Sequence, residues 1–171
     1  MFYLKQLSHT IQLHPSFFGT TLRSQIQEKV HNDVEGKCSG LYGYIICVVS
    51  LAEISSGKII PGNGLAEFDV KYNAIVLKPM KGEVVDAVVA SVNSQGFFAM
   101  CGPLSIFISK INIPSRFTHD SAGINNCFSF EDQVIGKDTA IRVKIISTRV
   151  DANAVVAIGS MLDDYLGVIK R

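Results

Sequence analysis

Lys81-Gly-Glu-Val-Val-Asp-Ala-Val-Val-Ala-Ser-Val-Asn-Ser-Gln-Gly-Phe-Phe-Ala99 is the stretch that decides the fold of the second half of this chain. Apolar residues recur there with strand-like spacing on both sides of a turn that contains glycine. This pattern is typical of a β-hairpin. No stretch of the chain carries a catalytic motif as clear as this hairpin pattern. The sequence therefore favours a binding protein over an enzyme.

The spacing within this hairpin indicates the first two strands of an OB barrel, a five-stranded fold that binds nucleic acids. The residues at the diagnostic positions are Ala87, Val89, Val92, Gly96 and Phe98. The second half also has the strand count of such a barrel, with strands predicted near 83–92, 97–101, 104–109, 139–148 and 154–161. Residues 112–137 show little periodicity, and we expect a long loop there, either functional or mobile.

The first half of the chain predicts a small α+β sheet with a helix on one face. Strands are expected at 2–14, 42–52 and 65–77, and a helix at 17–34 that ends before Gly36. The helix should bury the apolar residues that recur every four positions, which are Phe18, Leu22, Ile26 and Val30. The last strand should bury the residues that alternate along it, which are Phe68, Val70, Tyr72, Ala74 and Val76.

Residues 78–82 interrupt the strand periodicity of the first half before that of the second half begins. We place the joint between two domains there. The expected domains are 1–79, which is α+β, and 80–171, which is all-β. Neither domain contains a run of roughly 18 uncharged apolar residues, so no membrane helix is expected.

Net charge and residue spacing exclude several classes of function. The net charge is only +1, so strong non-specific nucleic-acid binding through a global basic field is not expected. The four cysteines are spaced too widely for paired metal ligands, and no serine, histidine or aspartate lies in a nucleophile-elbow sequence. We therefore expect no metal site, no cofactor and no catalytic residue.

Two kinds of residue on the predicted barrel are candidates for nucleic-acid binding. Phe98 and Phe107 lie on the strands that form the usual binding face, where rings stack on bases; alternatively, both rings belong to the core. Arg142 and Lys144 alternate with core residues, so both cations should share one strand face, and Arg149 follows before a turn. These three are the best phosphate contacts in the chain, although a merely solvated face explains them equally well.

Short motifs along nearly the whole chain resemble the family of the seventh subunits of eukaryotic RNA polymerase II, which are stalk subunits with relatives in the archaeal polymerases. The motifs are His14-Pro-Ser-Phe-Phe-Gly19, Asp33-Val-Glu-Gly36, Cys38-Ser-Gly40, Tyr42-Gly-Tyr44, Val70-Lys-Tyr72, Lys78-Pro-Met-Lys-Gly-Glu-Val-Val-Asp86, Gly102-Pro-Leu104, Gly159-Ser160 and Asp164-Tyr-Leu-Gly167. They look closer to the polymerase II member than to its polymerase I and III counterparts.

The resemblance implies a non-catalytic, nuclear stalk subunit that forms a heterodimer with the fourth subunit beside the RNA exit path. It implies an N-terminal RNP-like truncated domain, followed by an OB barrel of the ribosomal-protein-S-one type. Members of the family bind emerging single-stranded RNA and support initiation by keeping the clamp closed. Because Gln95 and Ser109 stand where related barrels often carry stacking rings, RNA binding here should be weak and insensitive to sequence.

The resemblance also implies that the tip of the first domain docks on the polymerase core. The residues expected to dock are His14, Phe17, Gly57, Ile59, Ile60, Pro61, Asn63 and Gly64, with Ile59 to Pro61 as the apolar plug. A first alternative is a free RNA-binding adaptor built on the same barrel, which a basic charge balance would favour. A second alternative is an enzyme on an OB-containing scaffold, which would need the catalytic spacings that this chain lacks.

Overall fold

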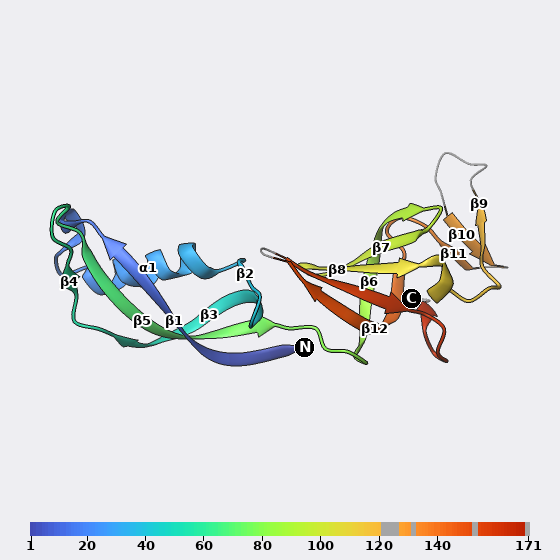
Figure 1. Cartoon of the computed structure of the whole chain (residues 1–171), viewed down its shortest axis with the longest axis horizontal. Coiled ribbons are helices and arrows are strands. Elements are labelled where there is room, and N and C mark those ends of the chain that lie inside the picture. Colours follow the sequence, from blue (N-terminus) through green and yellow to red (C-terminus); the bar gives the residue numbers. More distant parts are fainter. Residues whose placement is uncertain (121–126, 131–132, 152–153, 170–171) are drawn as a thin grey trace. The chain divides into compact units, whose positions relative to one another are not determined.

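The computed structural model describes residues 1–120, 127–130, 133–151 and 154–169 (Figure 1). The chain divides into two compact units, Met1–Lys78 and Pro79–Arg171. No helix among the described residues is long and apolar enough to cross a membrane.

The first unit is an antiparallel sheet with one α-helix. Its strands lie in the order β1 (Phe2–Leu13), β5 (Ala66–Leu77), β3 (Gly43–Ile54) and β2 (Cys38–Ser39). The short β4 (Lys58–Ile59) also pairs with β5. The β1–β5 register runs unbroken from Phe2 opposite Leu77 to Leu13 opposite Ala66.

Helix α1 (Leu22–Val34) packs on one face of this sheet and buries Ile26, Val30 and Val34. The sheet side of the interface holds the alternating residues of β5, and this prediction is confirmed: Phe68, Val70, Tyr72, Ala74 and Val76 are all buried. Glu35 is the C-cap, and Gly36 follows with φ +74° in the left-handed region that favours glycine, as expected.

The predicted start of the helix is wrong. Pro15–Phe17 form a separate 3-10 turn, η1, and α1 begins five residues later at Leu22. Phe18 therefore lies outside the helix and is exposed rather than buried. The reason is local: proline fits the first position of a helical turn, the His14 side chain caps that turn, and Gly19 then allows the chain to change direction before α1 starts.

The second unit is a closed five-stranded barrel. Its strands are β6 (Val84–Asn93), β7 (Gly96–Cys101), β8 (Leu104–Ser109), β12 (Ala140–Val150) and β13 (Val155–Ser160), in the order β13-β8-β7-β6-β12, and a β12–β13 pairing closes the ring. β14 (Gly167–Val168) adds to β12. The interior is filled by buried side chains that include Val89, Phe97, Ala99, Ile106, Ile108, Ile141 and Val143.

Gly96 fixes the first hairpin of the barrel. Its φ is +149°, and a Cβ at this position would collide with the carbonyl oxygen of Ile108 and lie 2.9 Å from the Cα of Ser109. Only glycine therefore lets β7 approach β8 this closely.

The long loop expected at 112–137 is wrong for the part of it that the structure describes. After the 3-10 turn η2 (Lys110–Asn112), that part forms a three-stranded antiparallel sheet of β9 (Thr118–Asp120), β10 (Cys127–Phe130) and β11 (Gln133–Ile135). Phe128 is buried, with its ring centroid 6.3 Å from that of Phe97. Strands of three or four residues are too short to give a readable period.

Candidate nucleic-acid interface and docking tip

An aromatic pair lies on the outer surface of the barrel. Phe98 on β7 is directly opposite Phe107 on β8, and their ring centroids are 4.8 Å apart at an interplanar angle of 44°. Each ring is half-buried, while the neighbours Phe97 and Ile106 point inward and are fully buried. Strand alternation therefore excludes Phe98 and Phe107 from the barrel interior.

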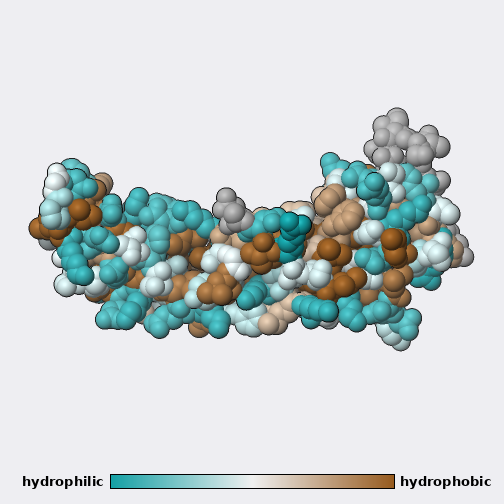
Figure 2. Space-filling view, in the orientation of Figure 1, coloured by the Kyte–Doolittle hydropathy of each residue, from teal (hydrophilic) through white to brown (hydrophobic). Residues whose placement is uncertain are grey.

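The pair belongs to a larger apolar patch. β13 runs parallel to β8 and places Ile158 beside Phe107, while Met100 follows Phe98 on the same side of β7. Ile158 and Met100 are both exposed. We call Phe98, Met100, Phe107 and Ile158 the barrel face. Figure 2 shows hydrophobic residues at the surface of this unit.

Ile158 is a residue that sequence reasoning missed. The alternation of β13 indicates that Val156 and Ile158 share a side, but it does not show which strand lies next to them. Their place beside Phe107 depends on the parallel β8–β13 pairing, which joins segments about fifty residues apart. The sequence carries no local signal for that pairing.

Arg142 and Lys144 share one strand face, as predicted, because Ile141, Val143 and Ile145 between and around them are buried. Each cation has an acidic partner. Arg142 Nε and Nη2 donate to Asp86 Oδ1 and Oδ2 at 2.6 and 2.9 Å, and Lys144 Nζ donates to Asp163 Oδ2 at 2.7 Å.

The pKa shifts follow from these contacts. Hydrogen bonding to Arg142 lowers the pKa of the Asp86 carboxyl, and hydrogen bonding to Asp86 raises the pKa of Arg142. Both side chains are therefore charged at neutral pH, and their charges offset one another. Seen from solution, the Arg142 site has much less positive charge than the sequence suggests.

Arg149 differs from the other two cations. Its side chain is 83% exposed, and its Nε lies 3.5 Å from Asp151 Oδ1, beyond a short ion-pair contact. The register sets Arg149 opposite Val156 on β13, two residues from Ile158. Among the three predicted cations, Arg149 is therefore the one that combines high exposure with a position near the barrel face.

The predicted docking residues gather at one end of the first unit. The 3-10 turn η1 is held by His14, whose Nδ1 lies 2.9 Å from Ser16 Oγ and accepts from the Ser16 backbone N–H at 3.2 Å. This cap leaves the Phe17 ring exposed.

The second part of this tip is the hairpin around residues 57–65. The Ile60 backbone N–H donates to Leu65 O at 2.8 Å, and Asn63 Oδ1 accepts from the Leu65 backbone N–H at 3.3 Å. Gly62 and Gly64 both have positive φ. Ile59 is 72% exposed, whereas Ile60 is half-buried, so Ile59 presents most of the apolar surface of the hairpin.

Two further residues complete the tip. Pro61 is exposed at the turn, and Gly57 lies against Phe68, where an added Cβ would come within 2.6 Å of the ring. A pocket of about 380 Å³ lined by His14, Phe17 and Leu65 joins η1 to the hairpin. His14 and Phe17 therefore lie next to the base of the hairpin that carries the other predicted docking residues.

The described residues contain no group of three or more histidine, cysteine, aspartate or glutamate side chains placed to hold a metal ion.

Comparison with known proteins first identifies the class of protein to which this chain belongs. Residues 8–64 match the family model described as the SHS2 domain found in the N terminus of Rpb7p/Rpc25p/MJ0397, and residues 78–159 match the S1 RNA binding domain. The chain is thus a two-domain protein with an SHS2 domain followed by an S1 barrel, which confirms the expected fold class. It belongs to the family of the RNA polymerase II subunit Rpb7.

The RNA polymerase II relatives cover nearly the whole chain. The chain is 49% identical to the DNA-directed RNA polymerase II subunit rpb7 of Schizosaccharomyces pombe over 170 residues, 98% of this chain and 99% of that protein. It is 44% identical to rpb7 of Dictyostelium discoideum over 171 residues, 99% of each. The RNA polymerase III subunit rpc8 of S. pombe is 30% identical over 120 residues, 70% of this chain and 57% of that protein. The expected closeness to polymerase II rather than polymerase III is therefore confirmed.

Proposed function

We propose that this chain is the non-catalytic stalk subunit of nuclear RNA polymerase II. It forms a heterodimer with the fourth subunit, docks on the polymerase core through its tip, binds emerging RNA on its barrel and supports initiation. Membership of the Rpb7 family supports the polymerase role. The observation that carries the RNA-binding role is the pair of outward rings, Phe98 and Phe107, on the S1 barrel.

The rings suit single-stranded RNA because every base has a face that stacks on an aromatic ring, whatever its sequence. Each stacked base contributes about 1–3 kcal/mol by alanine substitution. Gln95 and Ser109, at either end of the β7–β8 hairpin, have no ring to add. Binding to the barrel is accordingly weak and not selective for sequence.

The ion pairs determine which cations contribute. Arg142 and Lys144 are already bonded to Asp86 and Asp163, so a phosphate must compete with a carboxylate for each of them. Arg149 is exposed and beside the barrel face. The rings and Arg149 therefore provide most of the affinity, and Arg142 and Lys144 provide less.

The test is a fluorescence-anisotropy titration of the heterodimer on single-stranded RNA over a range of salt concentrations. The Phe98→Ala/Phe107→Ala variant should weaken binding by about tenfold or more, with an unchanged salt slope. Arg149→Ala should reduce the slope by about one unit.

The matched control for the rings is Phe18→Ala, which removes an exposed ring from the other unit. It should leave RNA affinity unchanged. Equal affinities for the double phenylalanine variant and Phe18→Ala would show that the RNA path lies elsewhere.

Core docking is tested separately with Ile59→Asp. A charge at this exposed apolar position should abolish recovery of core subunits with the chain and leave the heterodimer intact, because Ile59 lies on the outside of its hairpin. Val134→Asp, at an exposed valine of the second unit, is the control.

The same pull-down distinguishes the free-adaptor alternative. Wild-type chain that binds RNA yet recovers neither the fourth subunit nor core subunits from nuclear extract would favour the adaptor over the stalk subunit.

A further inference from the structure

One edge of the first sheet is long and continuous, and no strand pairs with it among the described residues. β1 is the terminal strand, and all of its twelve residues pair with β5 in an unbroken register. Among the described residues, no strand pairs with its other edge. Such an edge presents a row of free backbone N–H and C=O groups that another extended chain can join.

The ladder shows which backbone groups face outward. The Lys78 N–H donates to Met1 O at 2.9 Å, just beyond the pair Phe2 and Leu77. In an antiparallel ladder, bonded and non-bonded pairs alternate. The odd-numbered residues of β1 therefore bond to β5, and the even-numbered ones turn their N–H and C=O groups away from it; these are Phe2, Leu4, Gln6, Ser8, Thr10 and Gln12.

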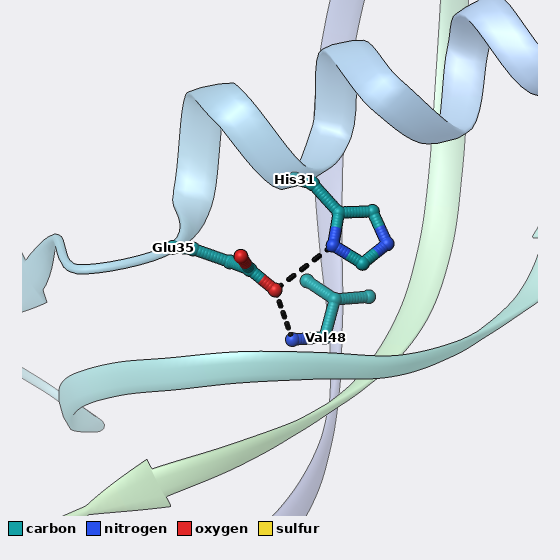
Figure 3. A network of polar contacts seen from close by, with 3 residues as sticks. All are labelled: His31, Glu35 and Val48. Atoms are coloured by element: carbon teal, nitrogen blue, oxygen red, sulfur yellow. Dashed lines mark hydrogen bonds and ion pairs between the residues drawn. The ribbon is translucent and has the colours of Figure 1, made fainter.

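The opposite edge of the same sheet is protected. β3 has irregular register steps at Ile45/Cys47, Val48/Ser50 and Leu51/Glu53. Figure 3 shows that the Glu35 carboxylate, reaching from the end of α1, accepts from the Val48 backbone N–H at 2.8 Å. Bulges and a bonded side chain are devices that prevent strand addition. β1 has neither device.

The exposed side chains of β1 show a gradient along the strand. Phe2 and Leu4 are 60% and 65% exposed, on the sheet face that α1 leaves open. Farther along the same face the side chains are polar, from Gln6 to Gln12, and Thr10 donates to Asp69 at 2.7 Å. One end of the edge is thus apolar and the other polar.

We propose that β1 accepts an extended segment of the partner subunit as an additional strand of this sheet. The segment carries apolar side chains beside Phe2 and Leu4 and polar ones beside Gln6 to Gln12. This inference rests on the proposed function, because it describes how the heterodimer forms.

A second copy of this chain fits poorly along the full length of the edge. Two β1 strands paired antiparallel about their centre would place the apolar end of each, Phe2 and Leu4, beside the polar end of the other, Thr10 and Gln12. The gradient therefore favours a partner whose own pattern differs from that of β1.

The direct test is amide hydrogen exchange, resolved by residue with NMR, on the isotopically labelled chain alone and bound to the fourth subunit. In the free chain the amides of Leu4, Gln6 and Ser8 should exchange quickly, and those of Lys5, Leu7 and His9 slowly. In the complex the first three should slow by at least about tenfold, while the other three remain protected.

A second test uses proline, which lacks a backbone N–H. Gln6→Pro removes an outward donor and leaves the β1–β5 bonds in place, since proline is tolerated on a strand edge. It should weaken heterodimer affinity by about tenfold. Gln6→Ala, which keeps the N–H, should not change it.

Each outcome decides the matter. If the complex forms but the amides of the even-numbered β1 residues stay unprotected, the strand addition is wrong and the proposed heterodimer is still supported. No complex at all overturns the heterodimer and the strand addition with it. Protection of the same amides in the chain alone, increasing with concentration, identifies a second copy as the occupant and overturns the inference.

Discussion

Glu35 is expected to hold the helix to the protected edge of the sheet, and replacing it should destabilise the first unit. Its Oε1 accepts from the Val48 backbone N–H at 2.8 Å and lies 2.9 Å from His31 Nδ1 (Figure 3). Glu35→Ala removes both contacts. Val48 is a buried residue at an irregular step in the β3 register, so its N–H then has no partner from β5.

The magnitude follows from that lost bond. A hydrogen bond to a charged group contributes about 1.5–3 kcal/mol, and an unpaired buried donor costs about 1–3 kcal/mol. The Glu35 side chain is about one-third exposed, so water replaces part of the bond. We expect the free energy of unfolding to fall by about 1–2 kcal/mol. Glu35→Gln, whose amide oxygen still accepts from Val48, should lose less than half of this.

The assay is urea unfolding followed by circular dichroism at a helical wavelength. Because α1 is the one α-helix among the described residues, this signal reports on the first unit. Glu28→Ala, at an exposed carboxylate of the same helix, is the control and should change stability by less than about 0.5 kcal/mol. If Glu35→Ala and Glu28→Ala have equal midpoints, the carboxylate does not hold β3.

Two further predictions concern the barrel. Gly96→Ala should destabilise it by at least about 2 kcal/mol, because an L-residue at φ +149° is strained and its Cβ collides with the Ile108 carbonyl. Gly102→Ala, where a Cβ meets open space, should cost less when urea unfolding is followed by the NMR amide signals of barrel residues. Hydrogen bonding to Arg142 lowers the pKa of Asp86 in the folded protein. The ion pair therefore stabilises the fold above the ordinary carboxyl pKa, and this stabilisation is lost as the pH falls through the lowered pKa of the folded state. The stability difference between wild type and Asp86→Asn should therefore shrink on acidification, and a constant difference from neutral to acidic pH would contradict the pairing.

The sequence predicts the elements with strong periods. The alternation from Phe68 to Val76 specifies both a strand and its buried side, because period two is unique to strands. The start of α1 was not predictable from period alone. Phe18 fits the helical spacing, yet the proline turn before it keeps it out of the helix.

Pairing between distant segments limits what the sequence shows about the binding surface. Alternation correctly indicates that Arg142 and Lys144 point outward, because their neighbours are core residues. It does not show what lies opposite, and the β6–β12 register places Asp86 directly against Arg142. Two of the three cations that look best in the sequence, Arg142 and Lys144, are thus already neutralised by the fold. The β6–β7 register separates Arg142 from Phe98, since Asp86 and Ser91, which pairs with Phe98, are five residues apart on β6, or about 17 Å of extended chain. Because Asp86 and Asp163 already hold Arg142 and Lys144, the steep salt dependence expected from three clustered cations gives way to a shallow one.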